Sequence, residues 1–157
     1  MESIDSRLIN LFAAEPRIGV LEASRRLGIA RGTVQARLDR LASSGVITGW
    51  GPEVSPEAIG FPVMAFLTLE IRQGSATSGG HDAVARHLAT IPEVLEAYTI
   101  TGAGDMWARV VARSNADLQR VIDLVLTDPG IDRSTTVIAL ATQIPHRVLP
   151  LVRSVVG

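Results

Sequence analysis

The chain has 157 residues, enough for one large domain or two small ones, and 46% of them are hydrophobic while only 4% are aromatic. This composition is typical of a globular protein with an aliphatic core, and it excludes a disordered chain. The lack of cysteine excludes disulfides and thiolate chemistry. No apolar run approaches the roughly 20 residues of a membrane span, and the N-terminus shows no signal-peptide pattern, so we expect a cytoplasmic protein.

The net charge of −1 conceals an asymmetry along the chain. Residues 1–50 carry seven Arg and five acidic residues, a net charge of +2, whereas residues 51–157 carry eight Arg and eleven acidic residues. Every basic residue is Arg, the side chain best suited to bidentate contacts with phosphate and guanine. A nucleic-acid contact is therefore to be sought in the first fifty residues.

Three helices are predicted in residues 1–50. The first begins near Ser3 and ends before Pro16, the second ends at Gly28, and the third spans Arg31–Ser44. Their apolar stripes are Ile4, Leu8, Leu11 and Phe12; Val20, Ala23 and Leu27; and Val34, Leu38 and Leu41. A tight turn joins the last two helices, which predicts a helix-turn-helix.

The outer face of the third helix is small and polar, and Gly32 and Ala36 would let it approach a surface closely. Its candidate DNA contacts are two residues that can reach base edges, Thr33 and Gln35, and three that can hold phosphates, Arg31, Arg37 and Arg40. A solvated helix face is the alternative. Asp39 favours it, because no Arg lies three or four residues away to neutralise that carboxylate.

The segment after the third helix changes character. Val46 and Ile47 are β-branched and apolar, and with Trp50 they predict a strand that closes over the helices as the start of a wing. Residues 51–62 are rich in Gly and Pro and predict a linker.

The remainder of the chain alternates between strands and helices. Strands are predicted at 63–72, 94–102, 105–113 and 131–142, helices at 83–92 and 114–130, and a flexible loop at 73–82. The order βαββαβ over residues 63–142 predicts a ferredoxin-like sheet with two helices on one face. The other face is too apolar for water, so we expect a second subunit to cover it. Residues 143–157 form an apolar tail, expected to pack on a partner or on the sheet.

Two motifs resemble those of one family. LGIARGTVQARLDRLASSGVITG, residues 27–49, resembles the helix-turn-helix of the Lrp/AsnC (feast/famine) transcriptional regulators, and TGAGDMWARVVA, residues 101–112, resembles that family's Gly-x-x-Asp turn. The resemblance covers nearly the whole chain. It implies an α+β fold, with a winged helix-turn-helix at 1–50 and a ferredoxin-like effector and dimerisation domain at 63–142.

The same resemblance implies function and partners. It implies a sequence-specific regulator, not an enzyme, that binds double-stranded DNA and responds to an amino-acid-like ligand. Family members form homodimers, often assembled into tetramers or octamers, so a homo-oligomer is expected here. No cofactor, metal or membrane partner is implied.

The family motif also assigns sites. The third helix becomes the recognition helix, with Thr33, Gln35 and Arg40 as groove contacts and Arg37 as a phosphate contact or a structural ion pair. The effector pocket is shaped by Gly102, Ala103, Gly104 and Asp105.

Two departures from the family pattern concern these sites. Gly104 stands where an aromatic or other bulky residue is common, which is expected to alter or abolish ligand binding. Ala30 stands where a capping Ser is common, which is expected to weaken the start of the recognition helix.

Blander interpretations stay open for several of these residues. The turn at 102–105 is also what a Gly-permitted hairpin requires, with an Asp side chain capping it. The histidines, His81, His87 and His146, lack metal-ligand spacing and are expected to be solvated. An enzyme is supported only by fold analogy. A ligand-binding oligomeric module without specific DNA binding is the main alternative function, favoured by the small charge of residues 1–50.

Overall fold

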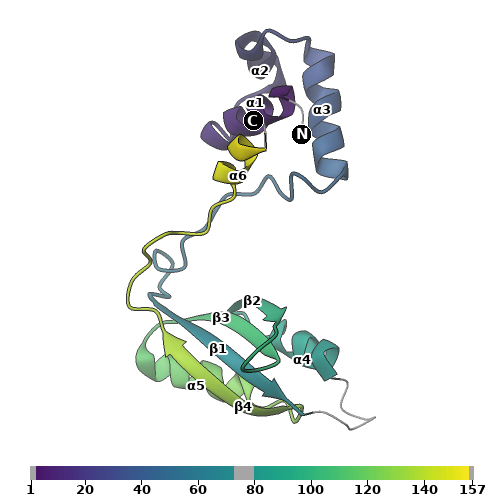
Figure 1. The fold of residues 1–157 in the computed structure, drawn as a ribbon. Helices are drawn as coiled ribbons and strands as arrows, with labels where there is room; N and C mark the ends of the chain where they lie inside the picture. The colour runs from purple at the N-terminus through teal and green to yellow at the C-terminus, as the bar shows by residue number, and fades with distance from the viewer. Residues whose placement is uncertain (1–2, 73–79, 156–157) are drawn as a thin grey trace. The chain divides into compact units, whose positions relative to one another are not determined.

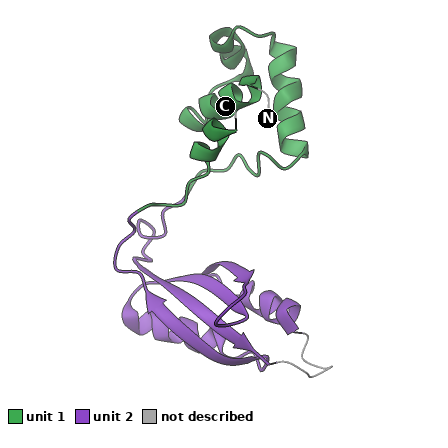
Figure 2. Cartoon of the chain, viewed as in Figure 1, with its two compact units in different colours: residues 1–53, 144–157 green, residues 54–143 purple. Residues whose placement is uncertain are grey.

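The structure, a computed structural model, describes residues 3–72 and 80–155. The chain forms two compact units, residues 1–53 with 144–157 and residues 54–143 (Figure 2). The helices are α1 (Ser3–Ala14), α2 (Val20–Leu27), α3 (Arg31–Ser43), α4 (Gly80–Leu88), α5 (Asn115–Val125) and α6 (Leu149–Ser154) (Figure 1). The strands are β1 (Val63–Ile71), β2 (Val94–Thr99), β3 (Met106–Ala112) and β4 (Ile131–Ile138). The predicted α+β fold is confirmed.

The first unit is built on α1, α2 and α3, as predicted. Leu8 from α1 and Val34 from α3 are fully buried, and the other residues of the predicted stripes are buried or half-buried around them. Gly28 ends α2 in the left-handed region, with φ of 67°, and its N–H donates to the Ser24 carbonyl. A glycine at this place makes the tight turn into α3 possible.

The strand predicted at residues 46–50 is not formed in the described structure. After α3, the N–H groups of Val46 and Ile47 both donate to the Leu41 carbonyl, at 2.9 and 3.0 Å. Ile47 packs against the helical core, and the Trp50 ring meets Phe12 edge-on with centroids 5.7 Å apart. The segment therefore covers the helices as predicted, but by side-chain packing, because it has no second strand with which to form a ladder.

The end of the chain also differs from expectation. Residues 149–154, expected in a tail on the sheet or on a partner, form α6, which packs on α1. Ser6 Oγ donates to the Val152 carbonyl at 3.3 Å, and Arg153 Nε donates to Asn10 Oδ1 at 3.3 Å. The chain thus leaves the first unit after residue 53 and returns to it at residue 144.

The second unit has the predicted topology. Its sheet has the order β2-β3-β1-β4, every neighbouring pair is antiparallel, and α4 and α5 pack on one face. The core between them contains Leu67, Leu69 and Val110 from the sheet and Val84 and Val121 from the helices. The predicted loop at 73–82 lies partly outside the described residues, and α4 begins at Gly80 rather than at residue 83.

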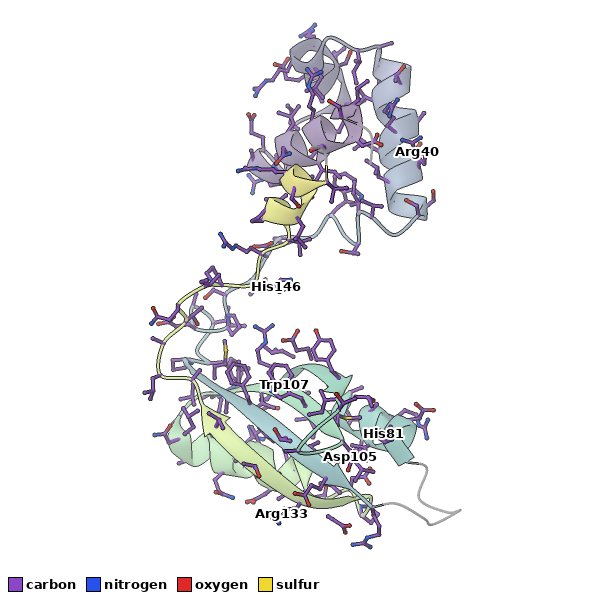
Figure 3. All side chains as sticks on the ribbon, viewed as in Figure 1. Arg40, His81, Asp105, Trp107, Arg133 and His146 are labelled. Atoms are coloured by element: carbon purple, nitrogen blue, oxygen red, sulfur yellow. The ribbon has the colours of Figure 1, made fainter. Side chains whose placement is uncertain are left out.

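The opposite face of the sheet (the open face) is apolar. It is formed by the alternate residues of the strands, including Met64, Phe66, Thr68, Tyr98, Trp107 and Val137. The Phe66 and Trp107 rings stack with centroids 5.2 Å apart, and the Tyr98 ring centroid is 5.9 Å from that of Trp107. Trp107 is labelled in Figure 3. Val137 is 60% exposed. Beside the rings, Arg109 Nε lies 2.9 Å from Glu96 Oε1, an ion pair whose N–H is not aligned for a hydrogen bond.

The expectation that His87 is simply solvated is wrong. Its Nε2 lies 2.9 Å from the Leu124 carbonyl oxygen and 3.2 Å from that of Val125, at the end of α5. The last carbonyls of a helix lack intrahelical partners, and a neighbouring donor satisfies them. His87 therefore ties α4 to α5. In the described ranges, no three acidic or histidine side chains gather as a metal site, and no helix is long and apolar enough to cross a membrane.

The hydrogen bonds at the start of α5 should stabilise the fold less at acidic pH. Asp117 accepts hydrogen bonds from Arg120 Nε at 2.7 Å and from the Arg113 N–H at 2.9 Å, and these hold the pKa of its carboxyl below the ordinary value. The stabilisation is complete above the unfolded-state pKa of about 4 and is lost as the pH falls through the lower folded-state pKa. We expect Asp117→Asn to lower Tm at pH 7. As the pH is lowered, the Tm of the variant should approach that of the wild type. In an Arg120→Gln background, Asp117→Asn should lower Tm by less, and this difference in Tm should depend less on pH. A constant difference across pH would contradict the assignment.

Candidate functional site

The outer face of α3 carries the candidate DNA contacts. Arg31, Thr33 and Gln35 are exposed, whereas Val34 and Leu38 point into the core. The helix thus exposes the arginine of its first turn and two polar side chains, Thr33 and Gln35, which lie on opposite edges of its outer face. Such side chains near the start of a helix suit contacts with phosphates and base edges in a major groove.

Two further candidates, Arg37 and Arg40, are joined to α1. The carboxylate of Asp5, whose side chain is only 5% exposed, lies between them. Arg37 Nη1 donates to Asp5 Oδ1 at 2.9 Å, and Arg40 Nη2 donates to Asp5 Oδ2 at 2.8 Å. The Arg37 side chain is 20% exposed and that of Arg40, labelled in Figure 3, is 53% exposed. Of the two roles predicted for Arg37, the geometry supports the ion pair, and Arg40 shares it.

The carboxylate of Asp39, which has no Arg three or four residues away, accepts a hydrogen bond from a neutral side chain of the same helix. Gln35 Nε2 donates to Asp39 Oδ1 at 2.8 Å, one turn away on the same helix. An amide carries two N–H donors and a carbonyl acceptor, so this bond uses only part of what Gln35 can offer. A donor and an acceptor side by side are the groups that read adenine. The bond also restricts the direction of the Gln35 side chain.

The start of α3 lacks a side-chain cap, as its sequence predicts. Ala30 occupies the N-cap position with extended backbone, φ −60° and ψ 142°, and no side-chain hydrogen bond is made there. Its carbonyl accepts from the Thr33 N–H at 2.9 Å. The backbone of Ala30 is thus already arranged as a capping residue requires.

Ala30→Ser is therefore expected to stabilise the protein by about 1 kcal/mol, because a serine hydroxyl can accept from an unpaired N–H of the first turn. Chemical denaturation of both proteins measures the difference. Ala36→Ser, at an exposed interior position of the same helix, is the matched control and should lower stability slightly, since serine is a poorer helix former. Equal effects at both positions would contradict the capping argument.

The candidate effector residues form the turn between β2 and β3. Asp105 fastens this turn to β1: its Oδ2 accepts from the Ile71 N–H at 2.7 Å, and its own N–H donates to the Leu69 carbonyl at 2.9 Å. Gly102 and Gly104 have φ of 106° and 136°, values that side-chain-bearing residues rarely adopt. The Asp105 side chain thus joins the turn to β1 rather than capping the turn itself, and this contact does not conflict with ligand binding, because a carboxylate has a second oxygen.

The absence of a side chain at Gly104 has a steric cause. A Cβ built there would overlap Cγ2 of Thr68 and lie 3.4 Å from the Leu69 carbonyl oxygen. Thr68 belongs to the open face, so the turn lies at the border of that face. A bulky residue at position 104 therefore does not fit beside Thr68 with this backbone.

Neither Asp5 nor Thr68 stands out in the sequence as a functional residue. Asp5 is an acid in the first turn of a helix, which is common, and Thr68 is one β-branched residue in a strand. Their partners are more than 30 positions away along the chain, for instance 32 for Arg37. Only the fold brings them to α3 and to the turn.

Comparison with known proteins matches each part of the chain to a family model. Residues 1–48 match a family model described as winged helix-turn-helix DNA-binding, and residues 64–149 match one described as the Lrp/AsnC ligand binding domain. The HTH-type transcriptional regulator FL11 of Pyrococcus horikoshii is 29% identical over 151 residues, which cover 96% of this chain and 97% of the relative.

Two solved structures share the fold. AsnC of Escherichia coli superposes with a TM-score of 0.84 at 26% identity, covering 96% of this chain and 99% of that one. A transcriptional regulator of Neisseria meningitidis, solved as an L-Met complex, gives a TM-score of 0.80 over 93% of each chain. At 21% identity, this second similarity shows the fold alone.

Proposed function

The chain belongs to the Lrp/AsnC family of transcriptional regulators, and from this premise we propose that α3 reads specific DNA sites while the turn at 102–105 binds a free amino acid. The predicted family and the predicted function, a DNA-binding regulator with a ligand-binding domain, are confirmed. We assign DNA binding to residues 1–50 and effector binding and oligomerisation to residues 63–142.

The exposed surface of α3 carries the proposal for DNA. Arg31 would hold a phosphate, and Thr33 and Gln35 would reach base edges. Gly32 and Ala36 lie between Thr33 and Gln35 on the helix surface. Because their side chains are small, the helix backbone can approach the groove closely. The low charge of the chain does not oppose this role, because an oligomer binds DNA through several such helices at once.

The open face is the proposed contact with a second copy of the chain. It combines the stacked Phe66 and Trp107 with the exposed Val137, and a monomer rarely leaves so large an apolar surface in water. A two-fold dimer would present two recognition helices to DNA. Their half-sites would lie about one helical turn apart, so the site would be roughly palindromic.

The effector proposal rests on the turn at 102–105. An amino acid offers an ammonium group and a carboxylate, which require an acceptor and several N–H donors. The Asp105 carboxylate and the exposed backbone of Gly102 and Ala103 supply groups of both kinds. Because the turn borders the open face, a ligand bound there would alter the contacts between subunits. A ligand can change DNA affinity only if it makes different contacts in two assembly states, and this position allows that. The L-Met bound by the Neisseria meningitidis protein supports free L-amino acids as the class to test.

The test is selection of duplexes from a random DNA pool by the full-length protein. Fluorescence anisotropy then compares a selected duplex with a scrambled one across salt concentrations, with and without each L-amino acid. We expect sequence-dependent binding whose affinity shifts with at least one amino acid. Equal, weak and salt-sensitive binding to both duplexes would reject the proposal and favour the assembly module without specific DNA binding.

A pair of variants locates the contact surface. Arg31→Gln should weaken binding and reduce the salt dependence by about one phosphate contact. Arg86→Gln, an exposed residue on α4 in the second unit, makes the same change in net charge and should leave both quantities unchanged. If the two variants behave alike, α3 is not the contact surface.

A further inference from the structure

We infer that Asp5 is a positioning residue for DNA recognition, because its carboxylate on α1 orients Arg37 and Arg40 of the recognition helix. The inference rests on the proposed role of α3 and adds to it a residue that touches no DNA.

The geometry makes Asp5 a common anchor for both arginines. Its two oxygens each accept from a different side chain, Oδ1 from Arg37 at 2.9 Å and Oδ2 from Arg40 at 2.8 Å. Because the carboxylate is planar and belongs to a buried side chain, the two guanidinium groups are held at fixed places relative to each other. A carboxylate removed from water in this way requires charged partners.

The anchor bears on recognition as well as on stability because Arg40 is still accessible. With half of its side chain exposed, it can be reached from the surface of α3. An arginine already held in position loses less conformational freedom when it meets DNA than one that moves freely, and preorganisation of this kind favours specific contacts.

Asp5→Asn distinguishes the positioning of the two arginines from their general electrostatic attraction to DNA. Asparagine is similar in shape, but it removes a negative charge and one strong acceptor. General attraction to phosphate should therefore be unchanged or stronger, whereas sequence-specific contacts should weaken. A residue that only stabilises the fold would not move these two quantities in different directions.

The experiment measures Kd of the full-length protein for the selected and the scrambled duplex, at a temperature where circular dichroism shows every variant folded. The specificity ratio, Kd for the scrambled duplex divided by Kd for the selected duplex, should fall about tenfold in Asp5→Asn, the loss expected for one misplaced specific contact. The scrambled duplex should bind no more weakly than it does to the wild type. Asp5→Glu, which keeps the charge, should retain more of the ratio. Leu8→Ala is the matched control, since Leu8 is fully buried on the same helix and belongs to the apolar core.

A double-variant cycle tests the route through Arg40. If Asp5 acts through Arg40, Asp5→Asn should lower the ratio little further in an Arg40→Gln background. The inference is overturned if Asp5→Asn keeps the wild-type ratio, or if it weakens the binding of both duplexes equally. A wild-type protein that does not distinguish the duplexes would reject the proposed role of α3 itself, and this result is visible without any variant.

Discussion

Replacing Gly104 with alanine should destabilise the protein by about 3 kcal/mol, because the new methyl group meets two obstacles at once. The backbone at this glycine has φ of 136°, which a residue with a Cβ adopts only under strain. The methyl group would also overlap Cγ2 of Thr68 on β1. Urea denaturation of the wild type and the variant gives the difference, read from the midpoint at an unchanged slope.

Two further variants separate these obstacles. Gly102 has φ of 106°, but no atom lies within 4 Å of the position that a methyl group would occupy there, so Gly102→Ala should show the backbone strain alone. Thr68→Ser removes the obstructing methyl and should restore part of the stability of Gly104→Ala, leaving the strain. If Gly102→Ala costs as much as Gly104→Ala, contact with Thr68 is not the reason for the glycine.

The second large effect is expected on assembly. Val137→Glu should convert the proposed dimer into a monomer, weakening association by at least about 2 kcal/mol, because a charge would be buried in the proposed apolar contact. Val137 pairs with Phe66 across the open face and is 60% exposed in the single chain, so the fold itself should tolerate the change. Sedimentation velocity over a range of concentrations measures the association.

The control for this variant is Leu124→Glu. Leu124 is 39% exposed on α5, on the other side of the sheet, and the substitution adds the same charge to an aliphatic position. This variant should assemble like the wild type, whereas Val137→Glu should also lose affinity for two-half-site DNA. Dissociation by Leu124→Glu with retained assembly of Val137→Glu would place the subunit contact on the helical side.

The elements predicted from sequence were those with a strong local period. The alternation of β1 and the stripe of α3 both depend on neighbours within a few residues, and both are confirmed. The strand expected at Val46 failed because a strand also requires a partner, which β-propensity does not reveal. For α6, an apolar composition predicted packing, but composition does not identify which surface is covered.

The sites show the same limit. The motif placed the turn at 102–105 and the recognition helix in sequence, but not their neighbours in space. The overlap that excludes a side chain at Gly104 comes from Thr68, and Asp5 accepts a hydrogen bond that Arg40 donates, each pair more than 30 residues apart. Local patterns predict elements, whereas these contacts depend on the packed fold.

The return of the chain to its first unit has a consequence for how the protein is made. The ribosome synthesises α1 before the second unit, whereas α6, which packs on α1, is synthesised after the second unit. Domains that are continuous in sequence can finish folding while synthesis proceeds, whereas this unit completes its packing only after the whole effector domain has been made. A chain cut short near residue 143 would therefore carry an intact effector domain and an incomplete DNA-binding unit, and a chimera that exchanges only residues 1–53 would separate α1 from the helix made to cover it.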